Sequence, residues 1–271
     1  MKMKHLAAGL LAGLAISTSA FATPSFTWNF NPSTDSPGPV SGSYSFNSGG
    51  EVVNAYGYST TNSDGSGKFL KQTLTLWDGG LGVKTSGSSN ENSSPNHAAD
   101  NDGKDELFIF EFSSADYIAT GFQIGWNNGA SGDARPDIRV WIGGDEDPIN
   151  FADACFVGCA NTLDNLGFED YLFGNVSTNA TQALSGGSGK YLIIAADYSV
   201  ADGQQCSWDW SWKSFKLVET CTPKYKNDYI KLSVLTGTEP PEQKVPEPAS
   251  LSLIALAMLG LAFARRRTAT V

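Results

Sequence analysis

The chain has 271 residues, a formal net charge of −10 at pH 7, and 41% hydrophobic against 17% charged residues. This length suits one sizeable domain or two small ones, and we expect one. The acidic surplus repels nucleic acid and anionic lipid headgroups, so the folded part is not expected to bind nucleic acid. A soluble extracellular existence and cation binding both fit such a charge.

The first 22 residues have the three parts of a secretory signal peptide. Lys2 and Lys4 supply the positive charge, and residues 6–16 form an apolar run too short to span a bilayer. Ala20 and Ala22 are the small residues that signal peptidase accepts, so we expect cleavage after Ala22. An uncleaved anchor or a buried core helix is the alternative.

Residues 23–236 are predicted to form an all-β domain with an antiparallel β-sandwich or jelly-roll-like architecture. Gly, Ser, Asn, Thr and Asp separate short runs rich in β-branched and aromatic residues, and several of these runs alternate apolar with polar residues. Residues 151–166 hint at a short helix or a disulfide-pinned loop, and residues 85–96 at a surface loop. The expected strands are residues 25–30, 51–59, 72–77, 106–112, 117–126, 137–142, 190–198, 204–217 and 228–235.

An acidic stretch before the fourth of these strands is the most suggestive of chemistry. It reads Asp-Asn-Asp-Gly-Lys-Asp-Glu, and its carboxylates could surround Ca²⁺, the one cofactor that the sequence suggests. Its spacing departs from an EF-hand loop, since a lysine stands where an oxygen ligand is needed. A plain acidic turn is the alternative, and unchanged thermal stability after calcium removal would contradict the metal site. The candidate ligands are Asp100, Asp102, Asp105 and Glu106.

Catalytic groups are scarce in the expected mature chain. His97 is its one histidine, and no Gly-x-Ser-x-Gly motif accompanies it, so a Ser-His-Asp site is not expected. Paired carboxylates of a secreted glycoside hydrolase remain a third possibility, because their separation in space is not visible in a sequence. We therefore expect a protein that is not an enzyme.

The four cysteines all lie in the exported part, where an even number indicates disulfides. The simplest pairing joins Cys155 to Cys159 and Cys206 to Cys221, although three connectivities are possible. A zinc site is the competing interpretation, but Cys-x3-Cys is not the usual zinc spacing.

Three tryptophans alternate with polar residues at Trp208, Trp210 and Trp212. On one strand they would share one face and could form a platform that stacks sugar rings. Burial in the core of the sandwich is the favoured alternative, because aromatic side chains supply much of the apolar area of a core.

After a predicted linker at residues 237–244, the C-terminal end has three parts. Pro246, Glu247 and Pro248 follow Val245, residues 249–264 form an uncharged span, and a basic tail at 265–271 begins with an arginine cluster. The span would reach about 24 Å as a helix, slightly less than a bilayer core of about 30 Å. Positive residues after the span stay in the cytoplasm, which agrees with an exported body. The three arginines that would stop translocation are Arg265, Arg266 and Arg267.

This Pro-Glu-Pro, apolar span and arginine order resembles the PEP-CTERM sorting tail of proteins handled by exosortase. The resemblance implies that exosortase, a membrane protease, recognises the motif at 245–248 and detaches the body from its transmembrane helix. An ordinary single-pass anchor is the alternative. Removal of Lys2, Lys4 and the three arginines would leave 13 basic against 28 acidic residues, a formal charge of −15.

A softer resemblance covers residues 79–83 and 94–103 with the Phe-rich strand that follows. These segments are similar to the body of exosortase-dependent surface proteins from Gram-negative bacteria that make exopolysaccharide. The leading hypothesis is thus an exported surface or matrix protein, held briefly in the inner membrane and associated with exopolysaccharide or biofilm. A carbohydrate-binding, lectin-like module is the alternative.

Overall fold

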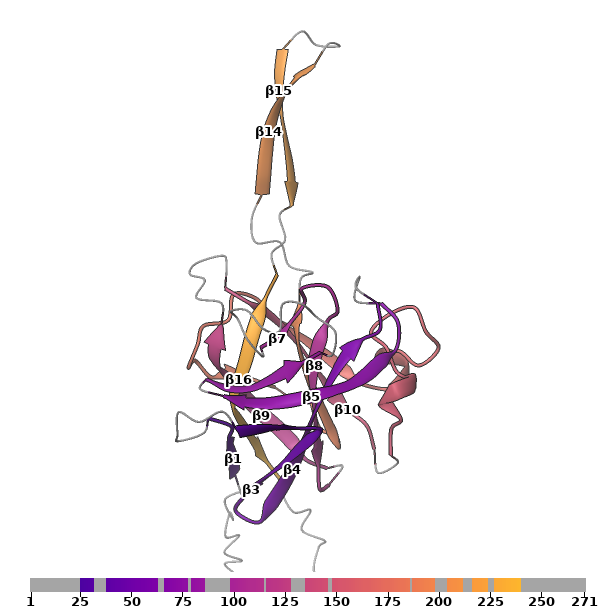
Figure 1. The fold of residues 1–271 in the computed structure, drawn as a ribbon, viewed down its shortest axis with the longest axis vertical. Coiled ribbons are helices and arrows are strands. Elements are labelled where there is room, and N and C mark those ends of the chain that lie inside the picture. The colour runs from indigo at the N-terminus through magenta and orange to yellow at the C-terminus, as the bar shows by residue number, and fades with distance from the viewer. Residues whose placement is uncertain are drawn as a thin grey trace, which may run out of the picture.

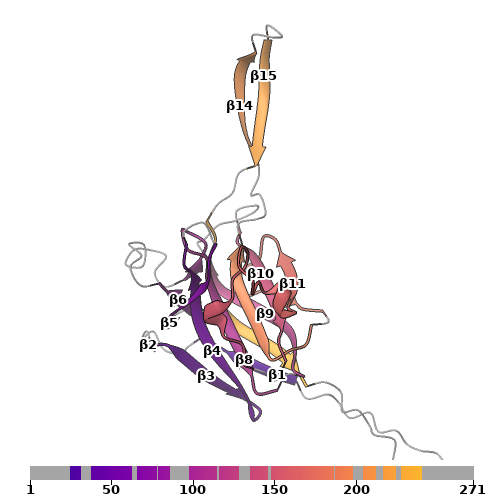
Figure 2. The same cartoon turned by 90° about the vertical axis from the view of Figure 1, so that its right-hand side faces the viewer.

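The computed structural model describes residues 25–31, 38–62, 66–77, 79–85, 98–114, 116–127, 135–145, 148–185, 187–197, 204–211, 216–223 and 227–239, some strand positions by their backbone alone. The described part is all-β and antiparallel, as predicted, and its strands form two layers that face each other (Figures 1 and 2). Both predicted processing signals and His97 lie outside these residues.

The first layer has the order β11-β10-β13-β8-β4, with β3 on the far side of β4. Every pair in it is antiparallel. Its strands are β3 (Ser43–Ser48), β4 (Glu51–Thr60), β8 (Glu106–Phe112), β10 (Asp137–Gly143), β11 (Glu169–Phe173) and β13 (Tyr191–Asp197).

The second layer has the order β5-β6-β16-β9-β12. Three short strands attach to it, because β1 and β7 also pair with β16 while β2 pairs with β5. Its strands are β1 (Ser25–Asn29), β2 (Gly38–Ser41), β5 (Phe69–Trp77), β6 (Gly80–Lys84), β7 (Ala99–Asp100), β9 (Ile118–Asn127), β12 (Gln182–Ala183) and β16 (Tyr229–Thr238).

Strand β5 joins the two layers at one corner. Its residues 69–72 pair with β4 of the first layer, while its residues 73–77 pair with β6 of the second. A strand that changes sheets in this way closes one side of a sandwich and shields its edge there.

The central strand β8 is buried on both faces. Phe108, Phe110 and Phe112 point into the main core between the layers, as their alternation predicted. Leu107 and Ile109 point the other way, into a second cluster on the outer face of the first layer. A covering segment is therefore needed outside that layer.

Residues 151–168 provide that cover. They contain two single-turn 3₁₀ helices, η3 (Phe151–Asp153) and η4 (Asp164–Leu166), and the first predicted disulfide, Cys155–Cys159. Phe151, Leu163 and Phe168 are buried against the outer cluster. The two sequence expectations for this region, a short helix and a disulfide-pinned loop, are both present.

Several expected element boundaries differ from the structure; β5, for example, begins at Phe69 and not at residue 72. Residues 204–217, expected as one strand, are the hairpin strands β14 (Gln204–Ser211) and β15 (Lys216–Pro223), which form a separate two-stranded sheet. Strand β16 continues to Thr238, two residues into the expected linker. Thr85, at the start of the expected surface loop, is buried, and the rest of that loop lies outside the described residues.

Candidate functional site

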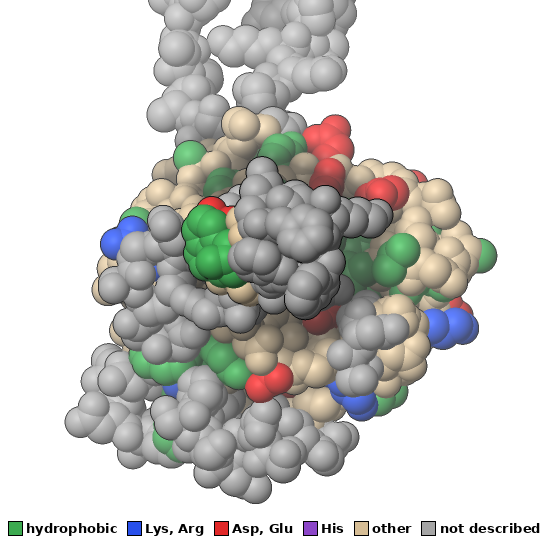
Figure 3. Space-filling view, turned by 90° about the horizontal axis from the view of Figure 1, so that it is seen from above, with side chains coloured by type: hydrophobic (Ala, Val, Ile, Leu, Met, Phe, Trp, Pro, Cys, Tyr) green, Lys and Arg blue, Asp and Glu red, His purple; other side chains and the backbone are tan. Residues whose placement is uncertain are grey.

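The hairpin β14–β15 stands clear of the sandwich (Figures 1 and 2). Its register pairs Trp208 with Glu219 and Trp210 with Leu217, which places these four positions on one side of the ribbon. The Trp208 side chain is 62% exposed and that of Leu217 is 56% exposed. Burial in the core, the favoured interpretation of this tryptophan, is therefore wrong. Figure 3 looks down on the hairpin and shows hydrophobic surface along one side of it.

The other two tryptophans of the predicted platform are not placed in the same detail. Trp210 lies in β14, where its backbone alone is described, and Trp212 lies outside the described residues. The platform as a set of three rings thus stays a prediction, and its exposed member is Trp208.

The second predicted disulfide, Cys206–Cys221, links the two strands of the hairpin. The two cysteines are direct partners in the register, with their Cα atoms 4.0 Å apart. Within the described part of the chain, Cys206, Glu219 and Cys221 make up the one group whose ligand atoms lie close enough for a metal ion. The zinc interpretation does not fit this group, because zinc binds thiolates and these sulfurs are bonded to each other.

The predicted calcium loop lies where the hairpin returns to the sandwich. Strand β7 pairs Asp100 with Tyr229, and the Tyr229 hydroxyl donates to Asp102 Oδ2 at 2.9 Å. The Asp102 amide donates to Asp100 Oδ1 at 2.9 Å, and the Asp105 amide donates to Thr60 Oγ1 at 3.0 Å.

The structure does not gather the four predicted calcium ligands into one cluster. Asp105 and Glu106 are both buried at the start of β8, and among the described residues these four carboxylates do not form a group of the size that a metal ion needs. Calcium binding by this loop stays a prediction. What the structure does show is that the loop holds Asp228 and Tyr229, where the chain enters β16 after the hairpin; we call this contact the base of the hairpin.

Asp228, only 2% exposed, is the centre of that base. Its amide donates to Asn101 Oδ1 at 2.8 Å, and its carbonyl accepts from the Asn101 amide at 3.3 Å. Its carboxylate accepts from the Asp137 amide at 3.0 Å, while Asp137 also pairs in register with Asp197, the last residue before the hairpin segment. Both ends of the hairpin segment are therefore fixed near Asp137.

Sequence reasoning did not find a groove beside the Cys155–Cys159 loop. It is a cavity of about 580 Å³ between the end of β10 and the segment that carries η3 and η4. Its polar lining includes Asp145, Asn150, Asp153, Asn161 and Ser188. The one feature of the sequence that could have indicated this groove was the glycine-rich acidic turn that begins at Gly143.

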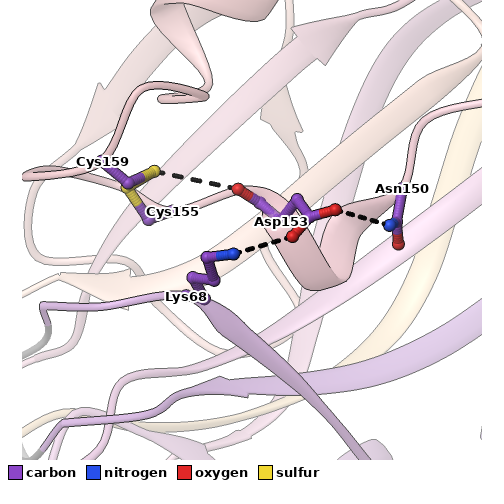
Figure 4. Close-up of polar contacts among 5 residues, drawn as sticks. All are labelled: Lys68, Asn150, Asp153, Cys155 and Cys159. Carbon is purple, nitrogen blue, oxygen red and sulfur yellow. Dashed lines mark hydrogen bonds and ion pairs between the residues drawn. A yellow bond between two sulfur atoms is a disulfide. The ribbon is translucent and has the colours of Figure 1, made fainter.

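Asp153 is a carboxylate of the groove that two neighbouring side chains hold in place (Figure 4). Lys68 Nζ donates to its Oδ1 and Asn150 Nδ2 to its Oδ2, both at 2.8 Å. The hydrogen bond and charge of Lys68 hold the pKa of this exposed carboxyl below its usual value. A glycoside hydrolase needs one carboxylic acid with a raised pKa, so Asp153 does not fit that role.

No helix in the described part of the chain has the length and apolar character needed to cross a membrane. The predicted span at 249–264, the Pro246–Pro248 motif and the Arg265–Arg267 cluster lie outside that part. Comparison with curated proteins and with solved structures found no match. Comparison with family models found one signal at the C-terminal end of the chain: residues 244–267 match the PEP-CTERM protein-sorting motif, which marks an exported protein targeted to exosortase.

Proposed function

We propose that the protein is a non-enzymatic polysaccharide-binding protein of the cell surface or extracellular matrix of a Gram-negative bacterium, delivered there by signal peptidase and exosortase. The observation that carries this proposal is the exposure of Trp208 on the projecting hairpin. Trp208 and Leu217 are both exposed on the same side of the ribbon, and neighbouring exposed apolar side chains, unlike a single one, are typical of a contact surface.

The chemistry around Trp208 suits a sugar better than a purely apolar partner. Indole offers a flat apolar face to the C–H groups of a sugar ring and a polar N–H at its edge. Glu219, the direct partner of Trp208 in the register, supplies a carboxylate that accepts hydrogen bonds from hydroxyl groups. Leu217 extends the apolar surface along the strand.

The charge of the mature chain bears on which polymers it binds. With a formal charge near −15 after processing, it repels anionic polysaccharides unless cations screen the charge. We therefore expect neutral polysaccharides to bind more tightly than uronate-rich ones at low salt.

A titration of the soluble chain, that is, the chain without its sorting tail, tests this proposal with tryptophan fluorescence as the readout. The polymers are dextran, galactomannan, soluble β-glucan, alginate and hyaluronan. Trp208→Ala should weaken binding of the best polymer by roughly tenfold or more, which corresponds to about 1.4 kcal/mol. Val157→Ala is the matched control, because Val157 has the same 62% exposure but lies in the covering segment. Unchanged fluorescence with every polymer, or equal binding by both variants, would contradict the proposal.

A further inference from the structure

The hairpin and the sorting tail are attached to opposite ends of one strand. Strand β16 begins at Tyr229, directly after the hairpin segment, and ends at Thr238, from which the chain continues to the sorting motif at 244–267. Its ten residues span about 33 Å at about 3.3 Å per residue. The hairpin is therefore separated from the start of the tail by the length of the sandwich.

The other processed end lies on the same side as the tail. Strand β1 runs antiparallel to β16 and pairs Ser25 with Thr238. In Figure 1, β1 lies at the end of the sandwich remote from β14 and β15. The described strands that come first and last in the chain thus bring Ser25 and Thr238 to one end of the sandwich, while β14, which carries the exposed tryptophan, lies beyond the other.

The start of β16, at the end opposite Thr238, is held by hydrogen bonds. Asp228 is buried and hydrogen-bonded to Asn101 and Asp137, and the Tyr229 hydroxyl is bonded to Asp102. Strand β14, which carries Trp208, lies beyond that end of the sandwich (Figure 1). The length of β16, about 33 Å, thus separates the hairpin from Thr238, and this is about four Debye lengths at physiological ionic strength, where that length is about 8 Å.

We infer that the sandwich is a spacer and that the protein bridges two surfaces: the hairpin holds a polysaccharide while the sorting tail still tethers the chain to its membrane. Cleavage at the sorting motif then changes what the bound polymer is attached to and leaves the binding surface unaltered. This inference rests on the proposed function. It also argues against the tethering membrane as the partner of Trp208, because β14 and Thr238 lie at opposite ends of the sandwich.

The test compares two forms of the chain, one soluble and without the sorting tail and the other tethered by it. The triple variant Pro246→Ala, Glu247→Ala, Pro248→Ala blocks the predicted motif, and the chain is inserted into phosphatidylcholine vesicles through residues 249–264. The probe is the fluorescein-labelled polymer of the panel above that the soluble chain binds best. We expect vesicles carrying the tethered chain to bind this polymer with the same affinity as the soluble chain, and Trp208→Ala to remove the binding in both.

The possible failures are distinguishable. A soluble chain that binds no polymer contradicts the proposed function itself. A soluble chain that binds while the tethered chain binds roughly tenfold more weakly or not at all overturns the bridge alone. Soluble chain that sediments with plain vesicles through Trp208 would assign the hairpin to lipid and overturn the bridge as well.

Discussion

At the scale of single residues, backbone contacts constrain this sandwich as strongly as its apolar side chains do. Gly80 opens β6 with φ of +120°, and a Cβ atom there would lie 2.0 Å from the carbonyl oxygen of Leu232 in β16. Gly50, in the turn between β3 and β4, has φ of +99° but no heavy atom within 4 Å of such a Cβ. The two positions share the left-handed φ and differ in their surroundings.

Gly80→Ala should therefore destabilise the protein far more than Gly50→Ala. The left-handed strain alone costs on the order of 1 kcal/mol, which is the expected effect at position 50. At position 80 the clash with Leu232 must also move β16, and we expect a loss above about 3 kcal/mol. Urea unfolding of both variants measures the difference, and equal losses would mean that β6 and β16 do not approach so closely.

Tyr229 is a second residue whose surroundings make a measurable difference. Burial, helped by its hydrogen bond to Asp102, raises the pKa of Tyr229 to about 12. Tyrosine in an unfolded chain ionises near pH 10, so the folded state holds its proton more tightly. The stability that this group contributes is complete below about pH 10 and is lost as the pH rises towards 12.

Tyr229→Phe should thus flatten the fall in stability between about pH 10 and pH 12. At neutral pH we expect it to cost about 1 kcal/mol, the usual net value of one hydrogen bond. Thermal unfolding at a series of alkaline pH values gives both quantities. Parallel curves for the variant and the parent would show that Tyr229 does not cause the pH dependence. Tyr56, whose pKa is also raised to about 12, would then be a remaining candidate for its cause.

At the scale of elements, eight of the sixteen described strands were predicted, while the hairpin and six further strands, β2, β3, β6, β7, β11 and β12, were not. The Phe108, Phe110 and Phe112 alternation gave β8, because side chains on a strand alternate between two faces. Residues 212–215 read Trp-Lys-Ser-Phe and contain none of the glycine, asparagine or proline residues that mark turns, so β14 and β15 looked like one strand. The cysteine pair was the available clue, since a Cys206–Cys221 bond places its residues opposite each other.

That bond should matter to the hairpin and not to the sandwich. An isolated two-stranded hairpin is marginally stable in water, and closing a loop of about 15 residues contributes about 3 kcal/mol. The double variant Cys206→Ser, Cys221→Ser should lose amide protection throughout β14 and β15 in hydrogen exchange while β8 stays protected. Cys155→Ser, Cys159→Ser is the matched control and should leave the hairpin protected. Loss of protection in both places would mean that the hairpin and the sandwich unfold together.

At the scale of the whole molecule, the two ends and the body have separate roles. The sorting motif at 244–267 targets the chain to exosortase. The sandwich separates the hairpin from Thr238, at the other end of β16. Polar groups around buried Asp228 connect the acidic loop to β10 and to the start of β16, the strand that follows the hairpin in the chain. Segments that lie far apart in the sequence are neighbours there.

Processing of the whole chain has a direct measurement. If the two predicted signals are processed, mass spectrometry of the protein from its native host should find an N-terminus at Thr23 and a C-terminus that lacks Arg265–Arg267. The triple variant at residues 246–248 should keep the arginines and the same N-terminus. Retention of the arginines by the unaltered chain would leave an ordinary membrane anchor.

The sequence alone determined the sorting motif, the disulfide pairing it favoured and the all-β class, since each depends on residues that lie close together in the chain or on local periodicity, while the signal peptide stays a prediction. Tertiary structure decided the rest: Trp208 is exposed, the acidic loop holds the start of β16, and Lys68 meets Asp153 across 85 positions. These outcomes depend on which strands pair and which layer covers which. Alternation shows that a strand has two faces, and only packing shows which of them is covered.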